Sequence, residues 1–495
     1  MVHLLGRRHN DTFVAHMDKF LSPWRLLRDQ LNQAPSPTPP GKNMSNRVDN
    51  GYWSGVAPSL SACPSGCSIS LPTVVLTLTQ LGRCTLILCT DTCCLPMLNG
   101  GSWCPFVSLD KRYTCVSGTV VLVHLILALS EVESFALRFF LQEGNRMAKP
   151  LKIGLIGTGG IAQTHMRALA KTDEIEVVAV CDIVEEKALR TAEKFGVPNV
   201  FVDYHDILEM DEIEAVSICT WNQAHCAPTV DALHAGKHVL VEKPMAATLA
   251  DATAMTKAVH ETGLVLMVGV QPRFGAARKT AKAIVDAGTL GDIYYAEAVA
   301  CRRCGIPGGS FIRADTAGIG TVADIGVYAL DEVLHLMGHP KPVAVSGITN
   351  NLLGTTHEPV EGIWHWVPED LEVEDFGVAT VRFENGALLV FKTSWIMHMD
   401  SLGGNLLLGT KAGMKMNPLT LFTHDYHRLV DIALQPGKKD GDLFLAKNMG
   451  FAEAIWNGTP SPVPADEMLI TNVIIQGLID SSKAGREVEV SVPEV

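Results

Sequence analysis

One stretch, LKIGLIGTGGIA from Leu151 to Ala162, constrains the fold of this chain more than any other part of it. A short run of branched apolar residues stops at a glycine-rich turn and helical periodicity follows at once, which predicts a buried strand, a tight turn and a helix. The pattern G-x-G-x-x-A is a dinucleotide-binding fingerprint, in which the helix N-terminus holds the phosphates. Its candidate cofactor contacts are Gly157, Gly159, Gly160, Ile161 and Ala162.

Strand and helix patterns alternate from Met147 to Val270, which predicts an α/β fold with a doubly wound parallel (Rossmann) sheet. Asp182 follows the second buried strand, about 20 residues beyond the glycine turn, where an acid can hydrogen-bond the adenosine ribose. Because Ile183 comes next, with no Arg or Ser to receive a 2′-phosphate, we expect NAD rather than NADP as the cofactor. The alternative role of Asp182 is to cap the following helix.

Composition separates residues 1–146 from the rest of the chain. They hold 12 basic and 9 acidic residues, against 28 and 44 in the remainder, and eight of the 13 cysteines. The net charge of −13 argues against nucleic acid or an anionic membrane as a partner. Without a secretory signal or a zinc-type cysteine spacing, we expect residues 1–146 to be an extension that is not a stable domain, ahead of a cytoplasmic enzyme starting at Met147. A targeting or regulatory segment is the alternative.

Two further strand ends carry polar residues. The sequence TWNQAH at 220–225 follows the fourth predicted strand, and Glu242-Lys243-Pro244 follows the fifth. Because the carboxyl ends of parallel strands meet at one edge of the sheet, we expect both segments beside the cofactor. Burial and an oxidised nicotinamide ring both disfavour an ammonium, so Lys243 could accept a hydroxyl proton as hydride leaves the same carbon. For His225, packing and cofactor contact remain equal alternatives.

Four segments together resemble the Gfo/Idh/MocA oxidoreductases of sugars and inositols, over the chain from Met147 onward. They are GTGGIAQTH, T-x-N-x-x-H at 220–225, AGKHVLVEKP at 235–244 and DIGVY at 324–328. The resemblance implies that Lys243 is catalytic, that Asp324 orients the sugar and that Tyr328 assists proton transfer. Tyr328 stands where many members carry His, as in the glucose–fructose oxidoreductase branch. The residues that the resemblance places along the nicotinamide ribose are Glu242, Thr220, Asn222 and His225.

Residues 271–495 are predicted to form a substrate-binding and dimerisation domain. Arg273 could contact substrate hydroxyls or form a salt-bridged hinge, and of the pair Arg302 and Arg303 we take Arg303 as the substrate-binding candidate. The i,i+4 and i,i+3 spacing of Asp324, Tyr328 and Asp331 places them on one helical face. An amphipathic helix whose polar face meets water is the alternative.

After Pro340 the pattern becomes mainly strands, with an Asn-Gly hairpin signal at 385–386. This predicts an α+β domain with an open-faced, mainly antiparallel sheet, of the kind that relatives use for dimer contacts, so we expect a homodimer or homotetramer. We expect Trp364-His365-Trp366 to be an exposed loop or an interface element. The spacing of His398, His424 and His427 suits no metal site, so we expect no metal.

Together these features predict an NAD(H)-dependent oxidoreductase that acts on a secondary alcohol of a cyclic sugar, sugar derivative or inositol. Two alternatives remain. One is a glycosidase that oxidises its sugar transiently with NAD, and the other is a non-catalytic NAD-sensing regulator with the same fold.

Overall fold

The computed structural model describes residues 52–55, 73–78, 84–89, 149–361, 363–435 and 440–495. The chain divides into two units, Met1–Glu143 and Gly144–Val495. In the first, three strands pair antiparallel in the order β1-β2-β3: β1 Tyr52–Gly55, β2 Thr73–Leu78 and β3 Cys84–Cys89. The remaining residues of that unit lie outside the described part of the chain, so the expectation that residues 1–146 form no stable domain stays a prediction.

The nucleotide half of the second unit is a six-stranded parallel sheet in the order β6-β5-β4-β7-β8-β9, as predicted. Its strands are β4 Leu151–Ile156, β5 Ile175–Cys181, β6 Asn199–Phe201, β7 Ala215–Ile218, β8 His238–Glu242 and β9 Leu266–Gly269. Its helices are α4 Gly160–Leu169, α5 Glu185–Phe195, α6 Tyr204–Leu208, α7 Cys226–His234 and α8 Leu249–Thr262. The strand order reverses at β4, between β5 and β7, which is where such sheets bind ligands.

The second half is a nine-stranded sheet in the order β17-β16-β15-β14-β10-β13-β12-β11-β18, in which β10 and β13 pair parallel and the other neighbours antiparallel. Its strands are β10 Ile293–Cys301, β11 Pro342–Asn350, β12 Phe376–Phe383, β13 Leu388–Ser394, β14 Leu406–Gly409, β15 Gly413–Met416, β16 Leu419–Asp425, β17 Arg428–Ala433 and β18 Val488–Glu489. Its helices are α9 Ala276–Asp286, α10 Thr321–Asp324, α11 Gly326–Met337, α12 Leu443–Asn457 and α13 Ala465–Ala484. The predicted mainly antiparallel sheet is therefore confirmed.

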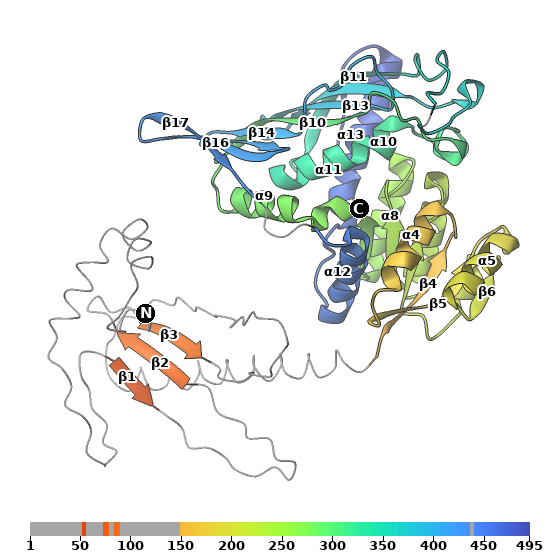
Figure 1. Ribbon diagram of the computed structural model, residues 1–495, viewed down its shortest axis with the longest axis horizontal. Helices are drawn as coiled ribbons and strands as arrows, with labels where there is room; N and C mark the ends of the chain where they lie inside the picture. The colour runs from red at the N-terminus through yellow and green to blue at the C-terminus, as the bar shows by residue number, and fades with distance from the viewer. Residues whose placement is uncertain (1–51, 56–72, 79–83, 90–148, 362, 436–439) are drawn as a thin grey trace, which may run out of the picture. The chain divides into compact units, whose positions relative to one another are not determined.

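Helices α9, α10, α11 and α13 lie along one face of this sheet, while β16 and β17 extend beyond them (Figure 1). Buried apolar side chains of α11, α13 and the central strands, such as Leu330, Phe391 and Leu478, form the core between the layers. On the opposite side, Leu408 and Phe422 are 37% and 41% exposed. Among the described helices, none is long and apolar enough to cross a membrane.

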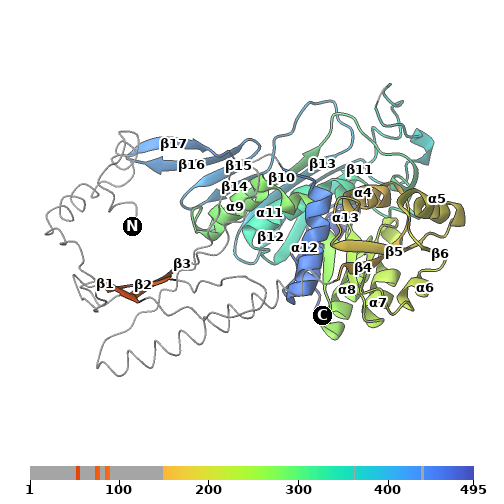
Figure 2. The same cartoon turned by 60° about the horizontal axis from the view of Figure 1, so that its bottom comes forward.

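The two halves share part of a core. Figure 2 shows α12 beside the nucleotide half, and Phe451 and Leu469, from α12 and α13, belong to the same buried cluster as Val241 and Val268. The backbone N–H of Val268 in β9 also donates to the carbonyl of Val463, at 3.1 Å. The C-terminal helices therefore complete a domain that begins some three hundred residues earlier.

The structure corrects the expectation for the Trp-His-Trp segment. Trp364 is 55% exposed, but Trp366 is only 1% exposed, and its indole N–H donates to the carbonyl of Gly354 at 2.8 Å. Trp364 therefore faces solvent, whereas Trp366 fills a small core with Trp395 and Leu371.

Candidate active site

The glycine turn between β4 and α4 leaves space for a ligand against the helix N-terminus. Gly157 has a φ of +86°, and a Cβ there would lie 2.8 Å from the backbone carbonyl of Cys219 at the end of β7. Above Gly159 and Gly160 a Cβ would meet no atom of the described chain within 4 Å. No side chain of the described residues caps α4, so its first N–H groups are available to an anion. The turn therefore fits a dinucleotide pyrophosphate.

The other two residues of the fingerprint support the helix. Ala162 is fully buried and packs in a small core with Leu155 and Val180, and the half-buried Ile161 packs against that core. The small Ala162 side chain keeps α4 close to the sheet.

Asp182, directly after β5, is tied to the glycine turn. Its Oδ2 accepts hydrogen bonds from the backbone N–H and the hydroxyl of Thr158, at 2.9 and 2.8 Å. Its Oδ1 accepts from the N–H of Val184 at 2.9 Å. Val184, not Asp182, holds the N-cap position of α5, so the helix-cap alternative is not realised. The half-buried carboxylate lies where an acid can reach a ribose.

Lys243, immediately after β8, meets the end of α10. Its Nζ donates to the backbone carbonyl and to Oδ1 of Asp324, both at 2.8 Å, and lies 5.0 Å from the centroid of the Tyr328 ring. The Lys243 and Asp324 side chains are only 13% and 12% exposed. Burial, the largest single effect, lowers the pKa of Lys243, but the Asp324 carboxylate together with Tyr328 and Glu242 outweighs it, and the net pKa is raised above its usual value. In the cofactor-free chain Lys243 is therefore an ammonium, and its neutral form beside an oxidised nicotinamide ring stays a prediction.

Asp324 and Tyr328 lie on two consecutive helices, α10 and α11, and not on one face of a single continuous helix. Asp324 ends α10, and its Oδ2 accepts from the indole N–H of Trp395, at 2.9 Å. Tyr328 is in the first turn of α11, and its hydroxyl accepts from Nε2 of Gln271 at 3.2 Å. Burial raises the pKa of Tyr328, which leaves its hydroxyl protonated and able to donate a hydrogen bond.

The segment at 220–225 packs against the second half of the chain. Thr220 Oγ1 donates to the carbonyl of Ala224 at 2.9 Å, and Asn222 Nδ2 donates to the carbonyl of Ala317 at 3.0 Å. His225 is 1% exposed, with Nδ1 2.8 Å from the carbonyl of Pro244. Burial lowers the pKa of His225, so it is a neutral side chain that holds this loop against the segment after Lys243. Of the two alternatives for His225, the structure favours packing over cofactor contact.

Glu242 departs from its expected role along a ribose. Its side chain is 4% exposed, and its Oε1 accepts from the Lys447 ammonium and lies 2.8 Å from Nε2 of His165. These partners come from α12 and α4. Because they occupy the carboxylate in the interior, Glu242 acts inside the protein and not at a ligand surface.

Sequence reasoning missed Lys447, His165, Trp395 and Gln271. His165 stands within the GTGGIAQTH segment, four residues before Leu169 on the buried face of α4. Lys447 lies four residues before the buried Phe451, so its helical spacing places a lysine on the apolar face of α12. A charged residue on a buried face is a signal that a partner exists. Trp395 and Gln271 carry no comparable signal.

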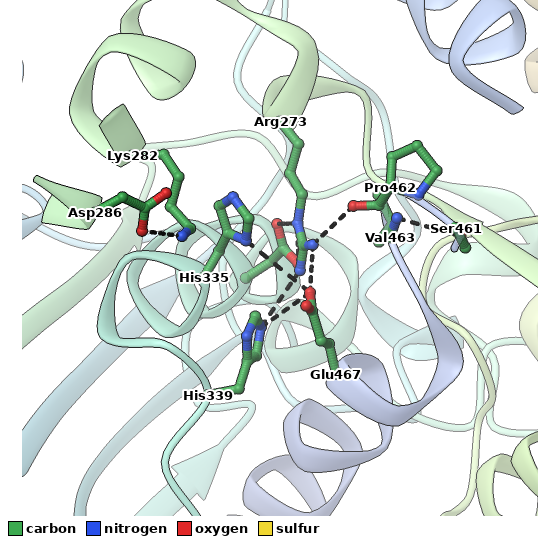
Figure 3. Close-up of polar contacts among 10 residues, drawn as sticks. Arg273, Lys282, Asp286, His335, His339, Ser461, Pro462, Val463 and Glu467 are labelled. Atoms are coloured by element: carbon green, nitrogen blue, oxygen red, sulfur yellow. Dashed lines mark hydrogen bonds and ion pairs between the residues drawn. The ribbon is translucent and has the colours of Figure 1, made fainter. Parts of the chain in front are cut away.

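Arg273 forms a separate buried ionic cluster (Figure 3). Its guanidinium donates to both carboxylate oxygens of Asp331, to Glu467 and to the carbonyl of Pro462. Arg273 is 8% exposed. The structure therefore corrects its assignment to substrate and favours the salt-bridged alternative. Asp331 also turns to this cluster instead of joining Asp324 and Tyr328.

The same cluster contains a candidate metal-ligand set. Potential ligand atoms of His335, His339 and Glu467 lie within 4.8 Å of one another. However, the Arg273 guanidinium donates to Glu467 and approaches Nε2 of His339 at 3.4 Å. Burial and the Arg273 charge lower the pKa of His335 to about 4 and that of His339 to about 3. A guanidinium thus already uses lone pairs that a metal ion would need.

Arg302 and Arg303 follow β10. Arg302 donates to the carbonyl of Gly305 at 3.1 Å and stacks over the Trp364 ring, with its guanidinium carbon 4.8 Å from the centroid. The Arg303 side chain is exposed, and its assignment to substrate remains a prediction.

Comparisons with known proteins match both halves of the second unit. A family model described as an oxidoreductase family with an NAD-binding Rossmann fold matches residues 151–270, and one described as the GFO/IDH/MocA C-terminal domain matches residues 279–415. D-glucoside 3-dehydrogenase of Escherichia coli (strain K12) is 30% identical over 346 residues, which are 69% of this chain and 98% of that protein.

Two further relatives are more distant or match over a shorter length. Inositol 2-dehydrogenase of Salmonella paratyphi B is 38% identical over 144 residues, which are 28% of this chain and 43% of the relative. The crystal structure of aldose-aldose oxidoreductase from Caulobacter crescentus, complexed with glycerol, superposes with a TM-score of 0.58 and 25% identity. That match covers 69% of this chain and all of the other.

Proposed function

Because the chain belongs to the Gfo/Idh/MocA family of NAD-binding oxidoreductases, we propose that it moves a hydride between a nicotinamide cofactor and a secondary alcohol of a cyclic sugar, sugar derivative or inositol. One observation carries the proposal. The ion pair of Lys243 with Asp324 lies at the carboxyl edge of the parallel sheet, the edge that also carries the glycine turn. A phosphate cradle and a proton-transfer group at one edge are the two parts that such a reaction needs.

Lys243 is the acid–base group of the proposed reaction. Bound nicotinamide would supply the hydride acceptor or donor. In the oxidative direction Lys243 takes the hydroxyl proton of the substrate, and in the reductive direction it gives a proton to the carbonyl oxygen. Since Asp324 raises the pKa of Lys243, the cofactor-free chain holds the proton that reduction consumes. Asp324 holds Nζ in place, and the protonated Tyr328 hydroxyl donates a hydrogen bond to the substrate.

NAD is the proposed cofactor in preference to NADP. The Asp182 carboxylate would accept hydrogen bonds from ribose hydroxyls, whereas a 2′-phosphate there would meet a second negative charge. Ile183, beside it, is 72% exposed and offers no positive charge to offset that repulsion.

Among sugars, a ring secondary alcohol of a D-glucoside is the first substrate class to test. D-glucoside 3-dehydrogenase is the relative matched across almost its whole length, although the identity of 30% leaves room for another sugar. Inositols come second, because the inositol 2-dehydrogenase match covers less than half of that protein.

The test is a panel of glucosides, uronates and inositols, assayed with the full chain and NAD or NADP. NADH absorbance and aglycone release are followed together, because aglycone release without net NADH would indicate a glycosidase instead. Lys243→Met is the central variant, and it is expected to lower turnover by at least about a hundredfold while leaving the NADH dissociation constant within about twofold. A variant that kept most turnover with unchanged NADH binding would refute the role of Lys243.

We also propose that a second copy of the chain covers the outer face of the large sheet. Leu408 pairs with Gly413, and Gly413 pairs with Phe422, so the two exposed apolar side chains lie in one row across three strands. Contiguous exposed apolar surface on a sheet face can mark a contact with another protein chain. Light scattering should show a dimer or tetramer, and Leu408→Glu with Phe422→Glu should shift it to monomer.

A further inference from the structure

A second lysine lies behind the proposed catalytic one and is completely buried. Lys447, on α12, is 0% exposed. Its ammonium donates to Oε1 of Glu242, lies 3.0 Å from Nε2 of His165, and stands 4.7 Å from the centroid of the Phe444 ring. Burying a lone ammonium costs several kcal/mol, so Lys447 depends on its carboxylate partner.

Glu242 is held from several directions. Burial alone would raise its pKa, but the Lys447 ammonium and His165 lower it well below its usual value, so Glu242 stays ionised. His165 stays neutral, because burial and the Lys447 charge both lower its pKa. On the β9 side, a Cβ at Gly269 would lie 2.7 Å from Glu242 Oε1 and 3.2 Å from Glu242 Cα. The absence of a side chain at Gly269 therefore leaves the space that this carboxylate occupies.

That fixed carboxylate holds the backbone of the next residue. Oε2 of Glu242 accepts from the backbone N–H of Lys243, at 3.3 Å. From this same peptide, the Lys243 side chain runs to Asp324 at the end of α10. Glu242 and Lys243 are thus consecutive residues with opposite charges and different partners. Glu242 binds α4 and α12, and Lys243 binds α10.

We propose that Lys447 is a positioning residue for proton transfer: by pinning Glu242 together with His165, it fixes the peptide from which Lys243 reaches its substrate. The proposal rests on the role of Lys243 in the proposed function. Lys447 does not contact Asp324, Tyr328 or the glycine turn in the structure, so it acts through Glu242. Because the Lys447 ammonium offsets the charge of Glu242, Asp324 is the carboxylate that pairs with the Lys243 ammonium.

The first experiment compares Lys447→Met with Lys171→Met in the full chain. Methionine is unbranched like lysine and only one atom shorter, but it carries no charge. Lys171 makes the matched control because its ion pair with Asp442, 2.6 Å long, also joins the α4 end to α12, but with 56% of its side chain exposed. K447M is expected to lower kcat by about tenfold or more with KM and the NADH dissociation constant within about twofold, because a misplaced catalytic group costs rate rather than binding. K171M should change none of these values.

Two further variants separate positioning from folding. Gly269→Ala displaces the Glu242 carboxylate without removing a charge, and it should reproduce the kcat loss. Lys447→Met alone leaves Glu242 as an unpaired buried charge, so it should lower the urea midpoint of unfolding. Adding Glu242→Gln removes the second buried charge, and it should restore that midpoint while kcat stays low. All rates are measured where circular dichroism shows a folded variant. Recovery of kcat in the double variant, or a normal kcat in K447M, would overturn the proposal.

A readout without turnover distinguishes this proposal from the proposed function. Acylation of Lys243 by an amine-specific reagent, followed by peptide mass spectrometry across pH, gives its apparent pKa. If the lysine is released from Asp324, that pKa should move by more than about half a unit in K447M and stay in place in K171M. An unmoved value in K447M contradicts the positioning role. A wild-type chain that turns over none of the panel contradicts the proposed function, while the labelling result still stands.

Discussion

Replacing Asp324 by asparagine should move the pH dependence of the reaction in a defined direction. Asp324 Oδ1 lies 2.8 Å from Lys243 Nζ, and both side chains are almost fully buried. An opposite charge at this range shifts a pKa by about 1–3 units, or about 1.4–4 kcal/mol. The asparagine amide would keep an oxygen for the hydrogen bond but lose the charge, so the opposing effect of burial would dominate. We therefore expect the pKa of Lys243 to fall by about 1–3 units in D324N.

The direction in which each rate changes with pH follows from which protonation state of Lys243 reacts. Reduction uses the ammonium, so its rate is full below the pKa of Lys243 and is lost above it. Oxidation uses the neutral amine, so its rate rises through the same pKa. In D324N both limbs of the pH profile, the fall of the reductive rate and the rise of the oxidative rate, should move toward lower pH. The variant should therefore oxidise its substrate at a pH where Lys243 of the wild type is still protonated.

The assay is kcat/KM in both directions across pH, with the best substrate of the panel and saturating cofactor. Trp395→Phe is the matched control, because it removes the hydrogen bond to Oδ2 of Asp324 but leaves the charge. Its limbs should stay where the wild-type limbs are, even if kcat falls. Limbs of D324N that stay within about 0.3 unit of the wild type would refute the assignment of Lys243 as the titrating group.

Three further predictions concern other parts of the molecule. Gly157→Ala should lower the unfolding midpoint because its Cβ would press on the backbone of Cys219, directly after β7. Gly159→Ala should leave stability unchanged and weaken NADH binding by at least about tenfold, measured by fluorescence. Ile183→Arg, at an exposed position, should tighten NADPH binding relative to NADH, and an unchanged ratio of the two dissociation constants would contradict the proposed position of the ribose. Arg273→Met should cost about 3–5 kcal/mol in urea unfolding by leaving buried carboxylates unpaired, while Arg190→Met, in an exposed i,i+4 pair, should have no measurable effect.

Features with local signals could be predicted from the sequence. The helix at Leu249–Thr262 is bounded by such signals, because the N-cap Thr248 and the left-handed Gly263 mark its ends. The Asn-Gly hairpin between β12 and β13 likewise has the expected turn, with Gly386 at a φ of +83°. In these segments the pattern of apolar residues and the punctuating glycines agree with the tertiary fold.

The partners of buried charges could not be predicted in the same way. Lys447 lies 205 residues from Glu242, and Arg273 lies 58 residues from Asp331. A helical pattern can indicate that a charge faces the interior, but it does not say which distant carboxylate meets it. In the cofactor-free chain the 2.8 Å contact of Lys243 with Asp324 acts against burial on the pKa of Lys243. The effect of a bound, oxidised nicotinamide ring on that pKa stays a prediction.

The shared core has a consequence for engineering this enzyme. A chimera that exchanged residues 151–270 alone for those of a relative would separate β9 from the Val463 carbonyl and Glu242 from the Lys447 ammonium. The nucleotide half therefore cannot be exchanged as one continuous segment. A working exchange has to include residues 443–469 as well, so two segments far apart in the sequence have to be replaced together.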